Sequence, residues 1–295
     1  MKTAKKNFLN AKIQGCKGFF ASHNYKLEQA YCEIIFDNLK KAKQLFEEIK
    51  AVLKNDDLGE AFFKLLQRRR GIRLIDFFNI ENNDFSCTYE MPFENGANDF
   101  RPDITVYVNG IPLAFVEVKV PNNREGIEAE RKRMDDGLAN KAFKMFFNEL
   151  QLLIFSNNQN YEIEPDALVP ITGAFYSTVQ PDRFRFSPFR EEDENLLHTK
   201  ANITINSVDE TAVLTEANAH AVKHTQEYQT NCDGMSYTNR IITSLLSKER
   251  FIYLLNYGFC YVREPNKTTG IIELRKHVMR YPQLLGSLTL LRKLE

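Results

Sequence analysis

The sequence lacks tryptophan and has little of several features that would indicate its class directly. Its five cysteines are scattered without a CxxC pair, so neither a disulfide framework nor a zinc site is indicated. Lys and Arg together number 39, as do Asp and Glu, and this balance points to no class of partner. No stretch reaches the roughly 20 apolar residues of a membrane helix, and no signal peptide is recognisable. We therefore expect a protein without a membrane segment, in the reducing cytoplasm.

Apolar residues make up 43% of the 295 residues, enough for a core in one large domain or two ordinary ones. Helical periodicity covers residues 25–54 and, more briefly, 58–70. Helical character returns at 123–149, with a break expected near Gly137. Strands with turn residues between them are expected at 72–80, 85–93, 101–108, 111–120, 151–157 and 167–179. This order predicts an α/β fold with a mixed sheet.

The rest of the chain divides by composition. Residues 181–232 are more polar and are predicted to be a loose junction. Residues 233–295 predict a helix, two strands and a final helix. We therefore expect a first domain at 1–180, the junction at 181–232, and a separate segment at 233–295.

The hairpin at 101–120 combines apolar strands with charged residues. A two-residue turn at Asn109-Gly110 would put Asp103 and Glu117 on opposite faces, because the side-chain period of a strand is two. A three-residue loop, Val108-Asn109-Gly110, with Gly110 left-handed in a bulge, separates the charged residues from the apolar ones. We favour this second register. It predicts one face with Ile104, Val106, Ala114, Val116 and Val118, and another with Asp103, Thr105, Glu117 and Lys119.

This register makes Asp103 and Glu117 diagonal neighbours, about 7–8 Å apart at the backbone. Two carboxylates at this distance can converge on Mg²⁺, which binds through one or two carboxylates and keeps waters and phosphate oxygens. Lys119, on the same face, would orient an attacking water or stabilise charge on a phosphorane. The alternative is that the three side chains pair on a solvent-facing hairpin. The strongly apolar remainder of both strands favours the metal site.

These residues resemble a nuclease motif. Pro102-Asp103 followed by Glu117-Val118-Lys119 is similar to the PD-(D/E)xK pattern, and "DITVYVNGIPLAFVEVKVP" resembles the N-terminal nuclease domain of the type I restriction endonuclease R subunit. The resemblance implies a restriction-endonuclease-like mixed sheet core flanked by helices. A small α/β segment would follow and lead into a truncated helicase domain. It also implies Mg²⁺ as cofactor, double-stranded DNA as substrate, and methylase and specificity subunits as partners.

The resemblance extends to two helices. "KLEQAYCEIIFDNL" is similar to the family's first helix, which implies Glu28 as a further metal ligand; Glu33 and a merely solvated glutamate remain alternatives. After the catalytic strand the family has Gln and, four residues later, Tyr. Glu130 and Met134 stand at these positions. Glu130 would either bind the metal or pair with Lys119, and we count it among the catalytic candidates.

The basic run beside Glu130 has two interpretations. Its members either contact DNA phosphates or form salt bridges on the helix surface with Glu128 and Asp135. The run consists of Arg131, Lys132 and Arg133.

The stretch "RKHVMRYPQLLGSLTLLRKL" resembles the entry to the family's first helicase domain. Gln283 stands where such motors carry a glutamine that binds the adenine of ATP. The phosphate-binding loop G-x-x-x-x-G-K-[ST] is absent from the sequence. We therefore expect ATP to be a cofactor of the full-length subunit only, and this chain to end inside the motor's first domain.

The expected function is that of a type I site-specific deoxyribonuclease. The alternative is a catalytically silent module that binds DNA or docks the motor to the methylase and specificity subunits. The departures at Glu130 and Met134 favour this alternative. A stand-alone nuclease of the same fold is a third possibility, against which the helicase-like text near the end of the chain argues.

Overall fold

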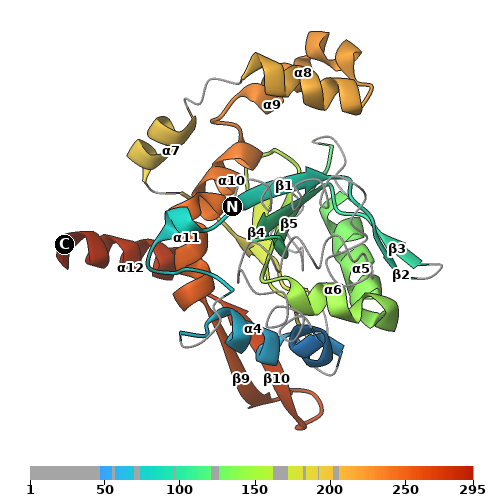
Figure 1. Ribbon diagram of the computed structural model, residues 1–295, viewed down its shortest axis with the longest axis vertical. Helices are drawn as coiled ribbons and strands as arrows, with labels where there is room; N and C mark the ends of the chain where they lie inside the picture. Colours follow the sequence, from blue (N-terminus) through green and yellow to red (C-terminus); the bar gives the residue numbers. More distant parts are fainter. Residues whose placement is uncertain are drawn as a thin grey trace.

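The computed structural model describes residues 47–54, 57–69, 74–95, 98–120, 126–161, 172–181, 184–191, 193–201 and 206–294. A central sheet is covered by helices on both faces (Figure 1). This arrangement confirms the predicted α/β class with a mixed sheet. Within the described ranges, no helix has the length and apolar character that a membrane crossing requires.

Six strands form the central sheet. In sheet order they are β1 (Phe85–Tyr89), β4 (Ile104–Val108), β5 (Ile111–Val118), β6 (Leu152–Ser156), β7 (Ala174–Ser177) and β8 (Ser187–Pro188). Strands β5 and β6 run parallel, and the other neighbouring pairs are antiparallel. The parallel pair needs a crossover, which the helices between β5 and β6 provide.

Two further hairpins lie outside the central sheet: β2 (Phe93–Asn95) with β3 (Asn98–Phe100), and β9 (Phe259–Pro265) with β10 (Ile272–Val278). Residues 47–54 are also helical. The α-helices are α4 (Glu60–Leu66), α5 (Gly126–Ala139), α6 (Lys144–Glu149), α7 (Glu194–Ala201), α8 (Ser207–Glu216), α9 (Gln226–Cys232), α10 (Tyr237–Leu246), α11 (Lys248–Tyr253) and α12 (Tyr281–Leu294). Shorter turns are the 3₁₀ segments η1 (Ile80–Asn82), η2 (Lys141–Phe143) and η3 (His220–His224), and the π-helical turn η4 (Leu254–Gly258).

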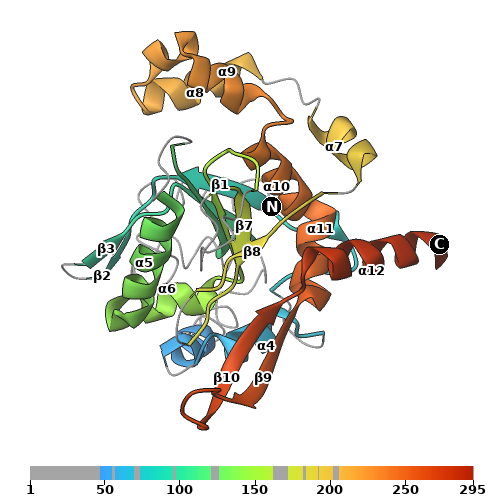
Figure 2. The same ribbon diagram turned by 180° about the vertical axis from the view of Figure 1, so that it is seen from behind.

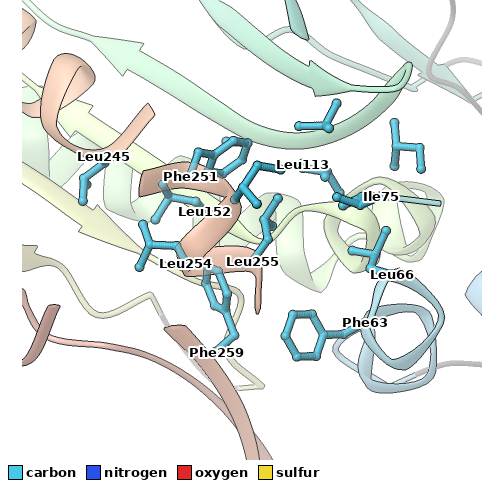
Figure 3. Close-up of a cluster of buried hydrophobic side chains, with 14 of the residues drawn as sticks. Phe63, Leu66, Ile75, Leu113, Leu152, Leu245, Phe251, Leu254, Leu255 and Phe259 are labelled. Carbon is cyan, nitrogen blue, oxygen red and sulfur yellow. The ribbon is translucent and has the colours of Figure 1, made fainter. Parts of the chain in front are cut away.

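Alternate residues of β5 and β6 divide between two hydrophobic cores, as the period of two requires. Val116 and Ile154 face a core that helices α10 and α11 complete with Leu245 and Phe251. Figure 3 shows this core, in which α4 and η4 also participate. Residues from the segment 233–295 therefore pack directly on the sheet.

The opposite face of the sheet is rich in phenylalanine. Phe115 and Phe155 pack there against α5, α6 and the β2–β3 hairpin. Their ring centroids lie 5.8 Å apart in an edge-to-face arrangement. Figure 2 shows α5 and α6 on one side of the sheet, and α10 and α11 on the other. The end of β5 thus emerges between two well-packed layers.

The predicted three-residue hairpin loop is wrong. Asn109 and Gly110 form a two-residue turn, with φ of 51° and 81°, and Val108 lies opposite Ile111. Positive φ at both positions is what a type I′ turn requires, and Asn-Gly supplies it at low cost. A bulge follows at the next step of the ladder, where the register shifts between Val106 and Tyr107.

This bulge restores the predicted division of faces. Beyond it, Val106 lies opposite Ala114 and Ile104 lies opposite Val116. Asp103 therefore comes level with Glu117, rather than diagonal to it. The expected grouping of charged and apolar residues is confirmed, although the turn that produces it differs.

Other expectations need correction. The predicted strand at 72–80 is not formed over its described part, 74–80, because the Asp76 side chain accepts the backbone N–H groups of Phe78 and Asn79 in a turn. Helix α5 continues through Gly137 and ends at Ala139. A side chain at Gly137 would press on the Phe147 ring at 3.3 Å, so the glycine allows close packing here.

The remaining element predictions are largely confirmed. Strand β6, helix α4, the β9–β10 hairpin and helix α12 lie where expected. The described part of 167–179 contains β7. The segment 181–232, predicted to be a junction, contains helices α7, α8 and α9 in its described part.

Candidate active site

Asp103 is anchored at the start of β4 by backbone contacts on both sides. Its main-chain oxygen accepts a 2.8 Å hydrogen bond from the N–H of Glu90. Its side-chain Oδ2 accepts a 2.7 Å hydrogen bond from the N–H of Val118, at the end of β5. The N–H of Asp103 also lies 3.4 Å from Oε2 of Glu117. The two strands therefore hold the Asp103 and Glu117 side chains next to each other.

Four side chains form an ion cluster beside Asp103: Glu117, Lys119, Glu130 and Arg133. The Lys119 ammonium lies 2.9 Å from Oε1 of Glu117 and 2.9 Å from Oε2 of Glu130. The main chain at Lys119 is fixed by a 2.7 Å hydrogen bond from its N–H to the carbonyl of Ser156. Strand β5 and helix α5 thus contribute one carboxylate each to a single lysine.

Arg133 closes the cluster from helix α5. Its Nε donates to Oε1 of Glu130 at 2.9 Å, and its Nη2 donates to Oε1 of Glu117. Its guanidinium carbon also lies 4.9 Å from the centre of the Phe100 ring, within the range of a cation–π contact. Both carboxylates are therefore shared between the same two cations.

The two carboxylates are far more buried than the cations that neutralise them. The side chains of Glu117 and Glu130 are each 3% exposed, whereas Lys119 is 27% and Arg133 is 41% exposed. Burial raises the pKa of Glu117 to about 7; the charges of Glu130 and Asp103 add to the rise, and Arg133 and Lys119 oppose it. A carboxylate in this position gains much from any further positive charge nearby.

Lys119 remains protonated at neutral pH. Burial would by itself lower the pKa of its ammonium, but the hydrogen bonds and charges of Glu130 and Glu117 outweigh burial and raise the pKa above its ordinary value. Lys119 is therefore suited to donate hydrogen bonds and to stabilise negative charge. It is not suited to remove a proton from water.

The donors present suit a hard divalent cation. Asp103 and Glu117 offer adjacent carboxylate oxygens, and Mg²⁺ is commonly held by one or two protein carboxylates. In the part of the chain that the structure describes, no group of three or more His, Cys, Asp or Glu side chains is arranged as a metal cage. The residues thus fit Mg²⁺ in donor type, while Lys119 and Arg133 occupy Oε1 of Glu117.

Met134 and Arg131 have structural environments. Met134 is fully buried in the phenylalanine-rich core, which explains an apolar residue where the family pattern has Tyr. Arg131 pairs with Glu128 and Asp135 on the surface of α5, as one of the two interpretations of the basic run predicted.

The role of Arg133 in the cluster was missed by the sequence reasoning. The signal was the spacing of Glu130 and Arg133, three residues apart on one helix, where side chains are neighbours. The pairing with Glu117 depends on how α5 packs on the sheet, which no local pattern reveals.

Two predicted site residues lie apart from this cluster. Glu28, with its alternative Glu33, falls outside the described residues. Gln283 lies in the first turn of α12, and its Oε1 accepts a 3.0 Å hydrogen bond from the N–H of Arg280, as in the second half of a capping box. It lines a cavity of about 560 Å³ together with His277 and Tyr257.

Known proteins share this region of the sequence. Residues 17–163 match the family model described as "Type I restriction enzyme R protein N terminus". Three relatives come from Methanocaldococcus jannaschii. The putative type I restriction enzyme MjaVIIP endonuclease subunit is 37% identical over 68 residues, 22% of this chain and 6% of that protein. The putative MjaVIIIP endonuclease subunit is 42% identical over 48 residues, which are 16% of this chain and 5% of that protein. The putative MjaIXP endonuclease subunit is 33% identical over 95 residues, which are 31% of this chain and 9% of that protein.

The aligned parts cover less than a tenth of each of these relatives. The matched range, 17–163, contains Asp103, the whole ion cluster and strands β1 to β6. Through this range the chain belongs to the family of type I restriction enzyme R proteins, of which it carries the N-terminal region.

Proposed function

We propose that this region is the Mg²⁺-dependent endonuclease domain of a type I restriction enzyme R subunit, with a restriction-endonuclease-like fold. The observation that carries the proposal is the convergence of Asp103, Glu117 and Lys119 at the end of a hairpin. Their order and spacing match the PD-(D/E)xK pattern, and the two strands bring all three to one place. An arbitrary surface hairpin has no reason to bury Glu117 almost completely.

Each residue has a distinct role in the proposed reaction. Asp103 and Glu117 would hold the metal, with Glu28 as a further ligand. Bound Mg²⁺ would supply Lewis acidity at the phosphodiester and activate water. Lys119, as a cation, would orient the attacking water and stabilise the negative charge on the phosphorane. Glu130 would position Lys119 through their 2.9 Å ion pair.

The substrate and partners follow from the family. We propose double-stranded DNA as substrate and the methylase and specificity subunits as partners. The division into a nuclease domain at 1–180, a junction at 181–232 and the start of a helicase domain from 233 is also part of this proposal. Since α10 and α11 pack on the nuclease sheet, a rigid connection between nuclease and motor would follow.

Mg²⁺-dependent nicking in the reconstituted restriction complex tests the proposal. Asp103→Ala and Lys119→Ala should each lower the cleavage rate by about 10²- to 10³-fold, the range for removing one group that stabilises a transition state. Arg131→Ala is the matched control, because Arg131 pairs on the outer side of the same helix. DNA binding and ATP hydrolysis by the complex should persist in all three variants, so that a loss of cleavage reports the active site.

A silent docking module is the second candidate, and one observation favours it. Each buried carboxylate already has two cationic partners, Lys119 and Arg133, so the cluster is internally neutral without a metal. Equal cleavage by wild type, Asp103→Ala and Lys119→Ala would support this candidate and reject the nuclease assignment.

We also propose that ATP binds only to the full-length subunit, with Gln283 against the adenine. The cavity beside Gln283 supports a ligand of that size, because small-molecule sites are typically 300–1,000 Å³. Gln283→Ala in the full-length subunit should raise the KM for ATP. An unchanged KM for ATP would leave Gln283 with its capping role alone.

A further inference from the structure

Arg133 and the proposed metal require the same carboxylate, that of Glu117. Oε1 of Glu117 accepts hydrogen bonds from both Lys119 and Arg133. Arg133 also binds both oxygens of Glu130, at 2.9 and 3.2 Å. A cation held by Glu117 therefore competes directly with a guanidinium that is already in place.

We propose that Arg133 is the displaceable counter-ion of this site: it neutralises Glu117 and Glu130 in the metal-free protein and must leave Glu117 before a divalent cation can bind. The proposal rests on the metal site proposed above for Asp103 and Glu117. It adds a residue that controls the affinity of that site for the metal and that the PD-(D/E)xK pattern does not contain.

Two observations distinguish Arg133 from Lys119 as the cation that moves. The first is exposure: the Arg133 side chain is 41% exposed and Lys119 is 27% exposed, so water reaches the guanidinium more easily. The second is anchoring. Lys119 directly follows β5 and is held by its backbone hydrogen bond to Ser156. Arg133 lies on α5 and reaches Glu117 only through its long side chain.

Phe100 gives the displaced guanidinium a place to remain. The centre of its ring already lies 4.9 Å from the Arg133 guanidinium carbon, and a cation is attracted to an aromatic ring within about 6 Å of the ring centre. Burying the two carboxylates of Glu117 and Glu130 without a counter-ion is strongly unfavourable. Arg133 therefore stabilises the metal-free fold, and the same contact opposes metal binding.

The affinity of the protein for Mn²⁺ tests this inference. Electron paramagnetic resonance measures it through the signal of the free ion. Arg133→Gln should bind Mn²⁺ about tenfold more tightly than wild type, the factor expected for losing one competing charge-assisted hydrogen bond. Arg133→Lys keeps the charge and loses the forked contact, so its affinity for Mn²⁺ should lie between those of wild type and Arg133→Gln. Arg131→Gln on the same helix should match wild type, and Asp103→Asn should abolish binding.

The outcomes separate this inference from the proposed function. If wild type binds Mn²⁺, Asp103→Asn does not, and both Arg133 variants bind no more tightly than wild type, Arg133 is not a competitor and the metal site stands. If wild type and Arg133→Gln show no binding that depends on Asp103, both proposals fail. Arg133→Lys keeps the test decisive should Arg133→Gln be unfolded.

A second measurement does not depend on any substitution. The Nε–H of Arg133, hydrogen-bonded to Glu130, should give a distinct ¹H–¹⁵N signal in wild-type protein. Titration with Mg²⁺ should shift this signal, while the Nε–H signal of Arg131 stays in place. A Mg²⁺ titration that saturates the protein and leaves the Arg133 signal unmoved would overturn the inference.

Discussion

Replacing Glu149 by glutamine should change how the stability of this protein depends on pH. Glu149 is the last residue of α6 and is fully buried. Neither of its carboxylate oxygens has a hydrogen-bond partner. Burial therefore raises the pKa of this carboxyl well above its ordinary value of 4.5, and the folded protein keeps the proton that the unfolded chain loses.

The magnitude follows from this difference in bound protons. Above pH 4.5 the unfolded chain releases the Glu149 proton while the folded state retains it, so unfolding becomes easier as the pH rises. One retained proton lowers the free energy of unfolding by about 1.4 kcal/mol per pH unit. This decline continues until the pH reaches the folded-state pKa. Glutamine has nearly the same shape and does not titrate, so the variant lacks this contribution.

Urea denaturation followed by circular dichroism, at several values between pH 5 and 8, measures the effect. The free energy of unfolding of Glu149→Gln minus that of wild type should increase with pH until the folded-state pKa of Glu149 is reached, with a slope of up to about 1.4 kcal/mol per pH unit. The Glu117 contribution cancels in this difference. The new amide is itself unpaired and costs about 1–3 kcal/mol, which offsets the difference by the same amount at every pH.

Glu81→Gln, at an exposed position of η1, is the control and should give a difference that does not vary with pH. Parallel stability curves for wild type and Glu149→Gln would refute the reasoning. They would mean that the charged Glu149 carboxylate is stabilised in the folded state, so that its pKa there does not differ from that in the unfolded chain.

Two further predictions concern the packing that positions the site. Gly59→Ala should lower the free energy of unfolding by roughly 2 kcal/mol or more, because Gly59 has φ of 76° and an added Cβ would lie 2.1 Å from the carbonyl oxygen of Asn148; an unchanged thermal midpoint would contradict this. Phe155→Ala should cost about 3–5 kcal/mol, since Phe155 is fully buried and stacks on Phe186 at 4.3 Å; in urea denaturation, a loss below 1 kcal/mol would show that this core collapses around the gap.

The hairpin shows how far local pattern determines a site. The alternation of apolar and charged residues predicted which side chains share a face, because burial of one face penalises any other register. The same pattern could not reveal that a two-residue turn and a later bulge produce that register. The Asn109-Gly110 pair indicated the turn, but the bulge that makes it compatible depends on how β5 packs between two layers.

The cluster around Glu117 shows where sequence reasoning ends. Asp103, Glu117 and Lys119 are recognisable because each follows from strand periodicity and a short motif. Arg133 reaches Glu117 from helix α5, and its partner choice is set by tertiary packing. The strand expected at 72–80 failed for the opposite reason: a local Asp76 turn outcompetes the β propensity of the apolar residues around it.

The location of a bound metal tests the central claim most directly. Anomalous diffraction from crystals of this protein soaked in Mn²⁺, a substitute for Mg²⁺, should show a peak within coordination distance of carboxylate oxygens of both Asp103 and Glu117. The peak should be absent in crystals of Asp103→Asn. A well-ordered Mn²⁺ that avoids these two residues, or none at all in crystals whose active site is open to solvent, would contradict the assignment of this hairpin as a nuclease centre.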